Sequence, residues 1–183
     1  MQYEVEQKFP VEDIATVEDR LREMGSTIAG VHLEVDVYYA HPSRDFGATD
    51  EALRIRRVGL SGYVTYKGPK VDTTTKTRRE IDLPLAIDEN GVAPWQKLLE
   101  ALGFKPIAEV RKHRRKTTIR WQNRKVEAAL DEVHRVGTFI ELELLATPDH
   151  VERDKACIAS LAEHLGLSES ERRSYLELLL EGQ

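Results

Sequence analysis

Tyr3-Glu4-Val5-Glu6-Gln7-Lys8-Phe9 alternates charged or polar side chains with apolar ones. Successive side chains of a β-strand point to opposite faces, so Glu4, Glu6 and Lys8 share one face and Val5 and Phe9 share the other. We predict a strand over residues 3–9, charged on one side and packed against apolar neighbours on the other.

The same alternation recurs along the chain. We predict seven further strands, over residues 31–39, 53–56, 63–67, 78–83, 108–120, 125–133 and 137–145, and a Thr/Lys-rich mobile loop over 71–77. Most connections are short and rich in turn residues, which favours antiparallel pairing. The pattern indicates an α+β fold whose strands form one β-rich unit that closes into a barrel.

Apolar residues at helical spacing predict helices over residues 10–24, 94–102 and 148–165, each followed by a glycine. Ser168 and Glu171 match a capping box for a last helix that ends near Leu180. We expect the helices to cover the apolar strand faces from outside. The last helix is either core or a surface through which two copies form a homodimer.

Composition limits the class of protein. With 183 residues, 40% hydrophobic and 32% charged, the chain is typical of one globular domain, 1–183, with the strands in 1–145 and C-terminal helices in 148–181. A net charge of −5 argues against general affinity for nucleic acid or anionic lipid. Without a targeting segment or membrane-spanning run, we expect a cytoplasmic protein with no nucleic-acid or membrane partner.

Charges of both signs repeat on one face of strand after strand. The face carries Glu4, Glu6, Lys8, Arg54, Arg56, Lys67, Arg78, Glu80, Asp82, Lys112, Arg114, Glu127, Asp131, Glu141 and Glu143. On one strand, such residues are explained by a solvated face with cross-strand ion pairs worth roughly 0.2–1 kcal/mol each. Across seven strands, a lined cavity explains them better. The strand around Lys112 is an exception, because Arg111, His113 and Arg115 make its other face polar as well, so its orientation stays open.

Converging charges need partners. Carboxylates a few ångströms apart take up a proton unless a cation separates them, and oxygen ligands alone suit Mg²⁺ or Mn²⁺. Converging arginines and lysines need an anion, and the guanidinium fork suits phosphate. The charged faces therefore predict a site for a divalent metal and a polyanion together.

The opening Glu4-x-Glu6-x-Lys8 is similar to the signature of the CYTH family, the triphosphate tunnel metalloenzymes, which include class IV adenylyl cyclases, thiamine triphosphatases and inorganic triphosphatases. It is followed by Asp36-x-Tyr38-Tyr39, Ala52-Leu53-Arg54-Ile55-Arg56, Tyr66-Lys67-Gly68-Pro69, Arg79-Glu80-x-Asp82, Val110-x-Lys112-x-Arg114, Leu130-Asp131 and Gly137-x-Phe139-x-Glu141-x-Glu143. The resemblance spans residues 3–145. It implies an eight-stranded antiparallel β-barrel, a triphosphate tunnel with a charged interior and helices outside.

The resemblance also implies roles for single residues. Mg²⁺ or Mn²⁺ would be held by Glu4, Glu6, Asp131, Glu141 and Glu143. Phosphates would be bound by Lys8, Arg54, Arg56, Lys67, Lys112 and Arg114. Lys8, Glu80 and Asp131 are the catalytic candidates, and the general base is either metal-activated water or a carboxylate such as Glu80.

Three functions stay open on sequence alone. The stretches 36–54 and 65–70 are most similar to the class IV adenylyl cyclase branch, which makes cyclic AMP and pyrophosphate from ATP. A triphosphatase acting on inorganic or thiamine triphosphate would use the same metal and cations. A non-catalytic triphosphate or polyphosphate binder is the third, and the many carboxylates argue against it.

Overall fold

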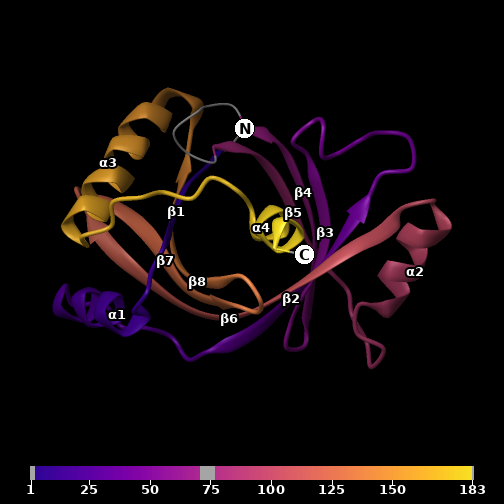
Figure 1. Ribbon diagram of the computed structural model, residues 1–183, viewed down its shortest axis with the longest axis horizontal. Helices are drawn as coiled ribbons and strands as arrows, with labels where there is room; N and C mark the ends of the chain where they lie inside the picture. Colours follow the sequence, from indigo (N-terminus) through magenta and orange to yellow (C-terminus); the bar gives the residue numbers. More distant parts are fainter. Residues whose placement is uncertain (1–2, 71–76, 183) are drawn as a thin grey trace.

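Eight strands close into a barrel in the computed structural model, which describes residues 3–70 and 77–182 (Figure 1). They are β1 (Tyr3–Pro10), β2 (His32–Ala40), β3 (Ala52–Val58), β4 (Ser61–Lys70), β5 (Arg78–Leu85), β6 (Lys105–Trp121), β7 (Arg124–Val133) and β8 (Gly137–Ala146). The order around the barrel is β1-β5-β4-β3-β2-β6-β7-β8, and every neighbouring pair is antiparallel. The predicted eight-stranded antiparallel barrel is confirmed. The loop predicted over 71–77 lies outside the described residues, except for Thr77.

β1 closes the barrel. It pairs with β8 along its whole length, and on its other side it meets β5 at the pair Glu4↔Arg78. In the β1–β8 register Glu6 lies opposite Glu143 and Lys8 lies opposite Glu141. Because paired residues of antiparallel strands project to the same face, this register brings the charged faces of the two strands together.

Helices cover part of the outer wall. α1 (Ile14–Glu23) and α3 (Val151–His164) lie outside the barrel beside β1, β7 and β8, and α2 (Ala93–Ala101) lies on the opposite side (Figure 1). Val5, Leu142, Ile158 and Leu161 are fully buried in the core between these helices and the strands. The apolar faces therefore point outward to the helices, as predicted.

The last helix, α4 (Tyr175–Glu181), lies across the barrel opening instead of against the outer wall (Figure 1). Tyr175 and Leu179 are buried against Tyr38, Val133 and Phe139, which come from β2, β7 and β8. The short 3-10 helix η1 (Pro148–His150) precedes α3. Of the two roles open from the sequence, core or interface, α4 has the packing of a core element.

Two predicted helix starts are wrong. Residues 165–174 are not helical, and the capping box belongs to Ser174 and Glu177 instead of Ser168 and Glu171. The intervening chain runs back along the barrel, where the Glu171 amide donates to the Lys8 carbonyl at 2.7 Å. At the other end of the chain, Pro10 is the last residue of β1, and Asp13 caps α1.

Candidate functional site

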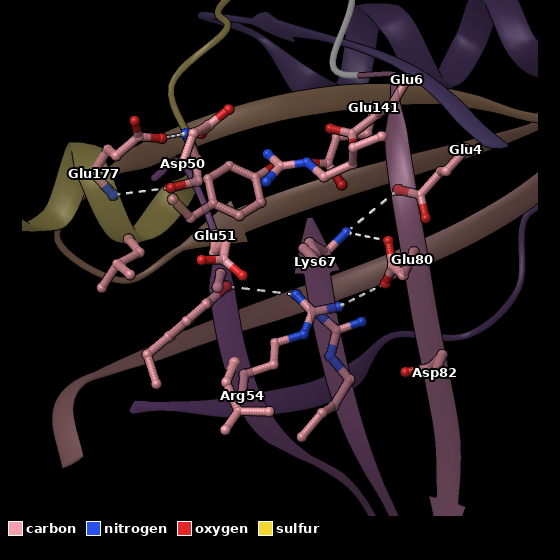
Figure 2. Close-up of a pocket in the computed structure, with 18 of the residues that line it drawn as sticks. Glu4, Glu6, Asp50, Glu51, Arg54, Lys67, Glu80, Asp82, Glu141 and Glu177 are labelled. Atoms are coloured by element: carbon pink, nitrogen blue, oxygen red, sulfur yellow. Dashed lines mark hydrogen bonds and ion pairs between the residues drawn. The ribbon is translucent and has the colours of Figure 1, made fainter. Parts of the chain in front are cut away.

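The barrel contains a cavity of about 550 Å³ whose lining is mainly charged (Figure 2). Among the described residues, the lining carboxylates are Glu4, Glu6, Asp50, Glu51, Glu80, Asp82, Glu127, Glu141, Glu143 and Glu177. The lining cations are Arg54, Arg56, Lys67, Arg78, Lys112, Arg114 and Lys116. The predicted charged interior is therefore present. Ten carboxylates and seven cations line the cavity, and Lys70 at Asp50 and Arg44 at Glu51 offset part of the carboxylate charge from outside the lining.

A lysine lies between two carboxylates where β4, β5 and β1 meet. Lys67 Nζ donates to Glu80 and lies 3.4 Å from Glu4 Oε1, and Arg54 Nη2 lies 3.8 Å from Glu80 Oε1 (Figure 2). Burial raises the pKa of Glu4, and its hydrogen bond to Glu80 raises it further. At Glu80, Lys67 and Arg54 outweigh burial and lower the pKa to about 2. The two shifts run in opposite directions, so Glu80 keeps its negative charge more readily than Glu4 does.

Glu143 lies between glutamates of both neighbouring strands. In register it faces Glu6 of β1 and Glu127 of β7. Burial raises the pKa of Glu143 to about 8, and the charges of Glu4, Glu6 and Glu127 add to the shift. Lys67 opposes this shift but does not cancel it, so a further cation beside these carboxylates would favour the ionised form of Glu143.

The donor set at this point fits a hard divalent cation. Glu4, Glu6 and Glu143 offer only oxygen atoms, which Mg²⁺ and Mn²⁺ prefer. Within residues 3–70 and 77–182, no three carboxylate, histidine or cysteine side chains form a ready-made metal site. The oxygens of Glu4, Glu6 and Glu143 line one cavity, in which carboxylates outnumber cations. To bind an ion, these three side chains would have to move closer together around it.

Two buried carboxylates on β2, Glu34 and Asp36, hold the predicted phosphate ligands in place. Asp36 accepts from Arg56 Nε at 2.6 Å and Nη2 at 2.7 Å, and it lies 3.4 Å from Arg54 Nη1. Glu34 Oε2 lies 3.1 Å from Lys112 Nζ and 3.2 Å from Arg56 Nη1. Burial opposes ionisation of both, but these cations outweigh it and hold the pKa of each carboxyl well below its usual range.

The roles of Glu34 and Asp36 went unrecognised in the sequence prediction. The signal was available, because Glu34 and Asp36 alternate within 31–39 as Glu4 and Glu6 do within 3–9. The orientation that the sequence left open is also settled: Lys112 and Arg114 point inward and are nearly fully buried. Burial, together with Arg114 and Arg56, lowers the pKa of Lys112 to about 8.

Arg114 connects the cavity to a carboxylate behind it. Its guanidinium donates to both oxygens of Asp131 and to Glu141. Asp131 is fully buried and does not line the cavity. Its Oδ2 also accepts a hydrogen bond from the Tyr175 hydroxyl.

Lys8 also lies outside the cavity lining. Its Nζ donates to the Arg173 carbonyl at 2.5 Å and lies 4.0 Å from the centroid of the Tyr175 ring. The structure thus brings most of the predicted site into one cavity, namely Glu4, Glu6, Arg54, Arg56, Lys67, Glu80, Lys112, Arg114, Glu141 and Glu143. Lys8 and Asp131 lie behind it, against Tyr175.

Comparison with known proteins agrees with this architecture. The CYTH domain pattern matches residues 2–175, and the chain belongs to the CYTH family. A Methanocaldococcus jannaschii protein named "Putative adenylate cyclase MJ0240" is 35% identical over 179 residues, which cover 96% of this chain and 97% of that protein. The family is typically metal-dependent and binds triphosphate substrates.

Solved structures share the fold. The PH1819 protein from Pyrococcus horikoshii OT3 is 38% identical, with a TM-score of 0.86 over 98% of this chain and 99% of that chain. A Hippeastrum protein, HpAC1, is 18% identical, with a TM-score of 0.68 over 100% of this chain and 97% of that chain. That protein is described as a "putative adenylyl cyclase" with a dominant triphosphatase activity. Among the described residues, no helix has the length and apolar character needed to cross a bilayer.

Proposed function

We propose that this protein is a metal-dependent enzyme of the class IV adenylyl cyclase type, which converts ATP to cyclic AMP and pyrophosphate. The observation that carries the proposal is the mixed lining of one cavity, where cations for phosphate alternate with an excess of carboxylates for metal. The name of the Methanocaldococcus relative supports the cyclase reading.

The phosphates would be bound by cations that line the cavity, namely Arg54, Arg56, Lys67, Lys112 and Arg114. Each is already held by a carboxylate, so its position is set before a ligand arrives. Glu4, Glu6 and Glu143 would hold the activating Mg²⁺ or Mn²⁺, and Glu141, which lines the same cavity, would lie near a second ion. Bound metal supplies the charge that a polyanion requires in this carboxylate-rich cavity and polarises the phosphoryl oxygens.

The reaction joins the ribose 3′-oxygen to the α-phosphorus, releases the hydroxyl proton to water, and breaks the bond between that phosphorus and the pyrophosphate oxygen. Cations around the phosphates stabilise the charge that grows on the leaving pyrophosphate. A carboxylate with a pKa of about 2 is a weak proton acceptor, which argues against Glu80 as the base. We assign Glu80 the task of holding Lys67 and Arg54 in place.

A triphosphatase is the second candidate. The Hippeastrum protein of the same fold is described as mainly a triphosphatase, and this cavity would present the same cations to a water nucleophile. A non-catalytic binder is the third candidate, and the carboxylates in excess of the cations argue against it because anion binding alone does not require them.

The deciding experiment separates the products. The protein is incubated with Mg²⁺ or Mn²⁺ and, separately, with ATP, thiamine triphosphate and tripolyphosphate, and the products are resolved by chromatography. Cyclic AMP with pyrophosphate supports the proposal, and orthophosphate without cyclic AMP supports a triphosphatase. Metal-dependent binding without any product supports the binder.

A further inference from the structure

The cavity differs in character from one end to the other. Toward β1 and β5, Lys67 and Arg54 lie among the carboxylates of Glu4 and Glu80, whereas Asp50 and Glu177 lie at the opposite end, beside α4 (Figure 2). The end beside α4, defined here by Asp50, Glu177, Leu176, Leu180 and Ile107, is called the α4 mouth. The two ends of the cavity therefore offer different side chains to a ligand, so an asymmetric ligand would bind in one orientation.

The acidic side chains of the α4 mouth are fixed by local partners. Asp50 accepts from the Lys70 amide at 2.9 Å and from Lys70 Nζ at 2.7 Å. Glu177 accepts from the Ser174 amide as part of the capping box of α4. Lys70 offsets the charge of Asp50, so the negative charge at this end comes mainly from Glu177, and it disfavours phosphate there.

The same mouth exposes large apolar side chains. Leu180 is 46% exposed and Ile107 is 49% exposed, although both line the cavity. Leu176 of α4 lines it as well and packs against the cluster that includes Tyr38. Exposed aliphatic surface at the edge of a charged cavity gains free energy when an apolar ligand group covers it.

We infer that the α4 mouth seats the base and sugar of a nucleoside triphosphate, with the triphosphate directed inward to Lys67, Arg54 and Lys112. The inference rests on the proposed function and deepens it, because it assigns the organic half of the substrate to α4 and Ile107. A volume of about 550 Å³ suits a whole nucleotide, because pockets for ligands of that size measure roughly 300–1,000 Å³. Tripolyphosphate has no group for this seat and leaves it empty.

The test compares two ligands in surface variants that keep the fold. Leu180→Gln and Ile107→Gln each remove apolar area from the mouth, and Leu60→Gln, at a 93% exposed position in the β3–β4 turn, is the matched control. With Mg²⁺ present, we expect ATP to bind about fivefold more weakly to each mouth variant, as measured by titration calorimetry. Tripolyphosphate binding stays within about twofold of wild type, and Leu60→Gln changes neither.

The outcomes distinguish a failure of the nucleoside seat at the α4 mouth from a failure of the proposed function. Selective loss of ATP binding supports the seat. If wild type binds both ligands and the mouth variants weaken both equally, or neither, the seat is refuted while the triphosphate site stands. If wild type binds neither ligand with Mg²⁺ or Mn²⁺, the proposed function fails and the seat fails with it.

Discussion

The Tyr175 hydroxyl donates a 2.8 Å hydrogen bond to Asp131 Oδ2 and so ties α4 to the buried wall of the barrel. The ring of the same tyrosine contacts Lys8 Nζ and lies 5.4 Å from Lys112 Nζ. One side chain of the last helix thus touches three residues predicted to act in catalysis or phosphate binding. The position of α4 and the arrangement of these charges depend on each other.

Replacing Tyr175 by phenylalanine should separate the contribution of the hydroxyl to stability from that of the ring. Tyr175→Phe keeps the ring under Lys8 but removes a donor to a buried carboxylate, which costs about 1–3 kcal/mol of unfolding free energy. Tyr175→Leu also removes the cation–π contact and leaves a void, so it should cost more. Urea unfolding measures both. Equal stability of Tyr175→Phe and wild type would show that the hydrogen bond contributes nothing.

The planar guanidinium should be needed for tripolyphosphate binding at position 56 but not at position 57. Arg56→Lys keeps the charge opposite Asp36 but loses the planar fork that suits phosphate, so tripolyphosphate with Mg²⁺ should bind about tenfold more weakly. Arg57→Lys, on the same strand but exposed, is the control and should bind like wild type. Titration calorimetry gives both constants. Similar affinities for the two variants would remove Arg56 from the phosphate site.

Metal should stabilise the fold through the glutamates of β1 and β8. A ligand at 100 times its Kd adds about 2.7 kcal/mol, so Mn²⁺ should raise the melting temperature of wild type and EDTA should reverse the rise. Glu6→Gln should lose most of this increase, whereas Glu132→Gln, an exposed residue of β7, should keep it. Thermal unfolding with and without Mn²⁺ measures the difference. An unchanged increase in Glu6→Gln would exclude Glu6 as a ligand.

Metal-free stability should fall as pH rises, because of Glu143. Its pKa is about 8 in the folded protein and 4.5 ordinarily, so between these values the folded state holds a proton that the unfolded chain has released. The unfolded state then binds fewer protons, and the contribution of Glu143 to the unfolding free energy declines from pH 4.5 to pH 8 and levels off above.

The measurement compares wild type with Glu143→Gln, which cannot ionise. Denaturant unfolding at several pH values between 5 and 8, in EDTA, should show a smaller decline with pH in the variant. Parallel pH profiles for the two proteins would contradict the assigned shift. With wild type, Mg²⁺ binding should release a proton and tighten toward pH 8, since the carboxylate must deprotonate to hold the ion.

Local pattern was enough to predict the strands and the direction of their faces. The alternation in 3–9 and 137–145 specifies which side chains share a face, and Gln122 and Asn123 supply the positive φ values of 45° and 62° that the tight β6–β7 turn requires. The acidic alternation of Glu34 and Asp36 was equally local, yet its meaning depends on Arg56 and Lys112, which come from other strands.

The place of α4 could not be predicted from local pattern. Its apolar residues indicate that one face is buried, but an amphipathic helix carries no information about which surface covers it. Only the folded chain shows that Tyr175 lies between Lys8 and Asp131 and separates both from the cavity. The family resemblance implied that Lys8 and Asp131 act in the site, but it gave no information about the position of α4.

The order of the elements has a consequence for how the cavity is made. All eight strands precede α4 in the chain, so during synthesis the wall can pair and close before Tyr175 leaves the ribosome. Until then, Lys8 and Asp131 lack their contacts with Tyr175. A chain synthesised only to residue 174 therefore lacks the ring and the hydroxyl that contact Lys8 and Asp131, and this side of the cavity forms only when α4 packs onto the barrel.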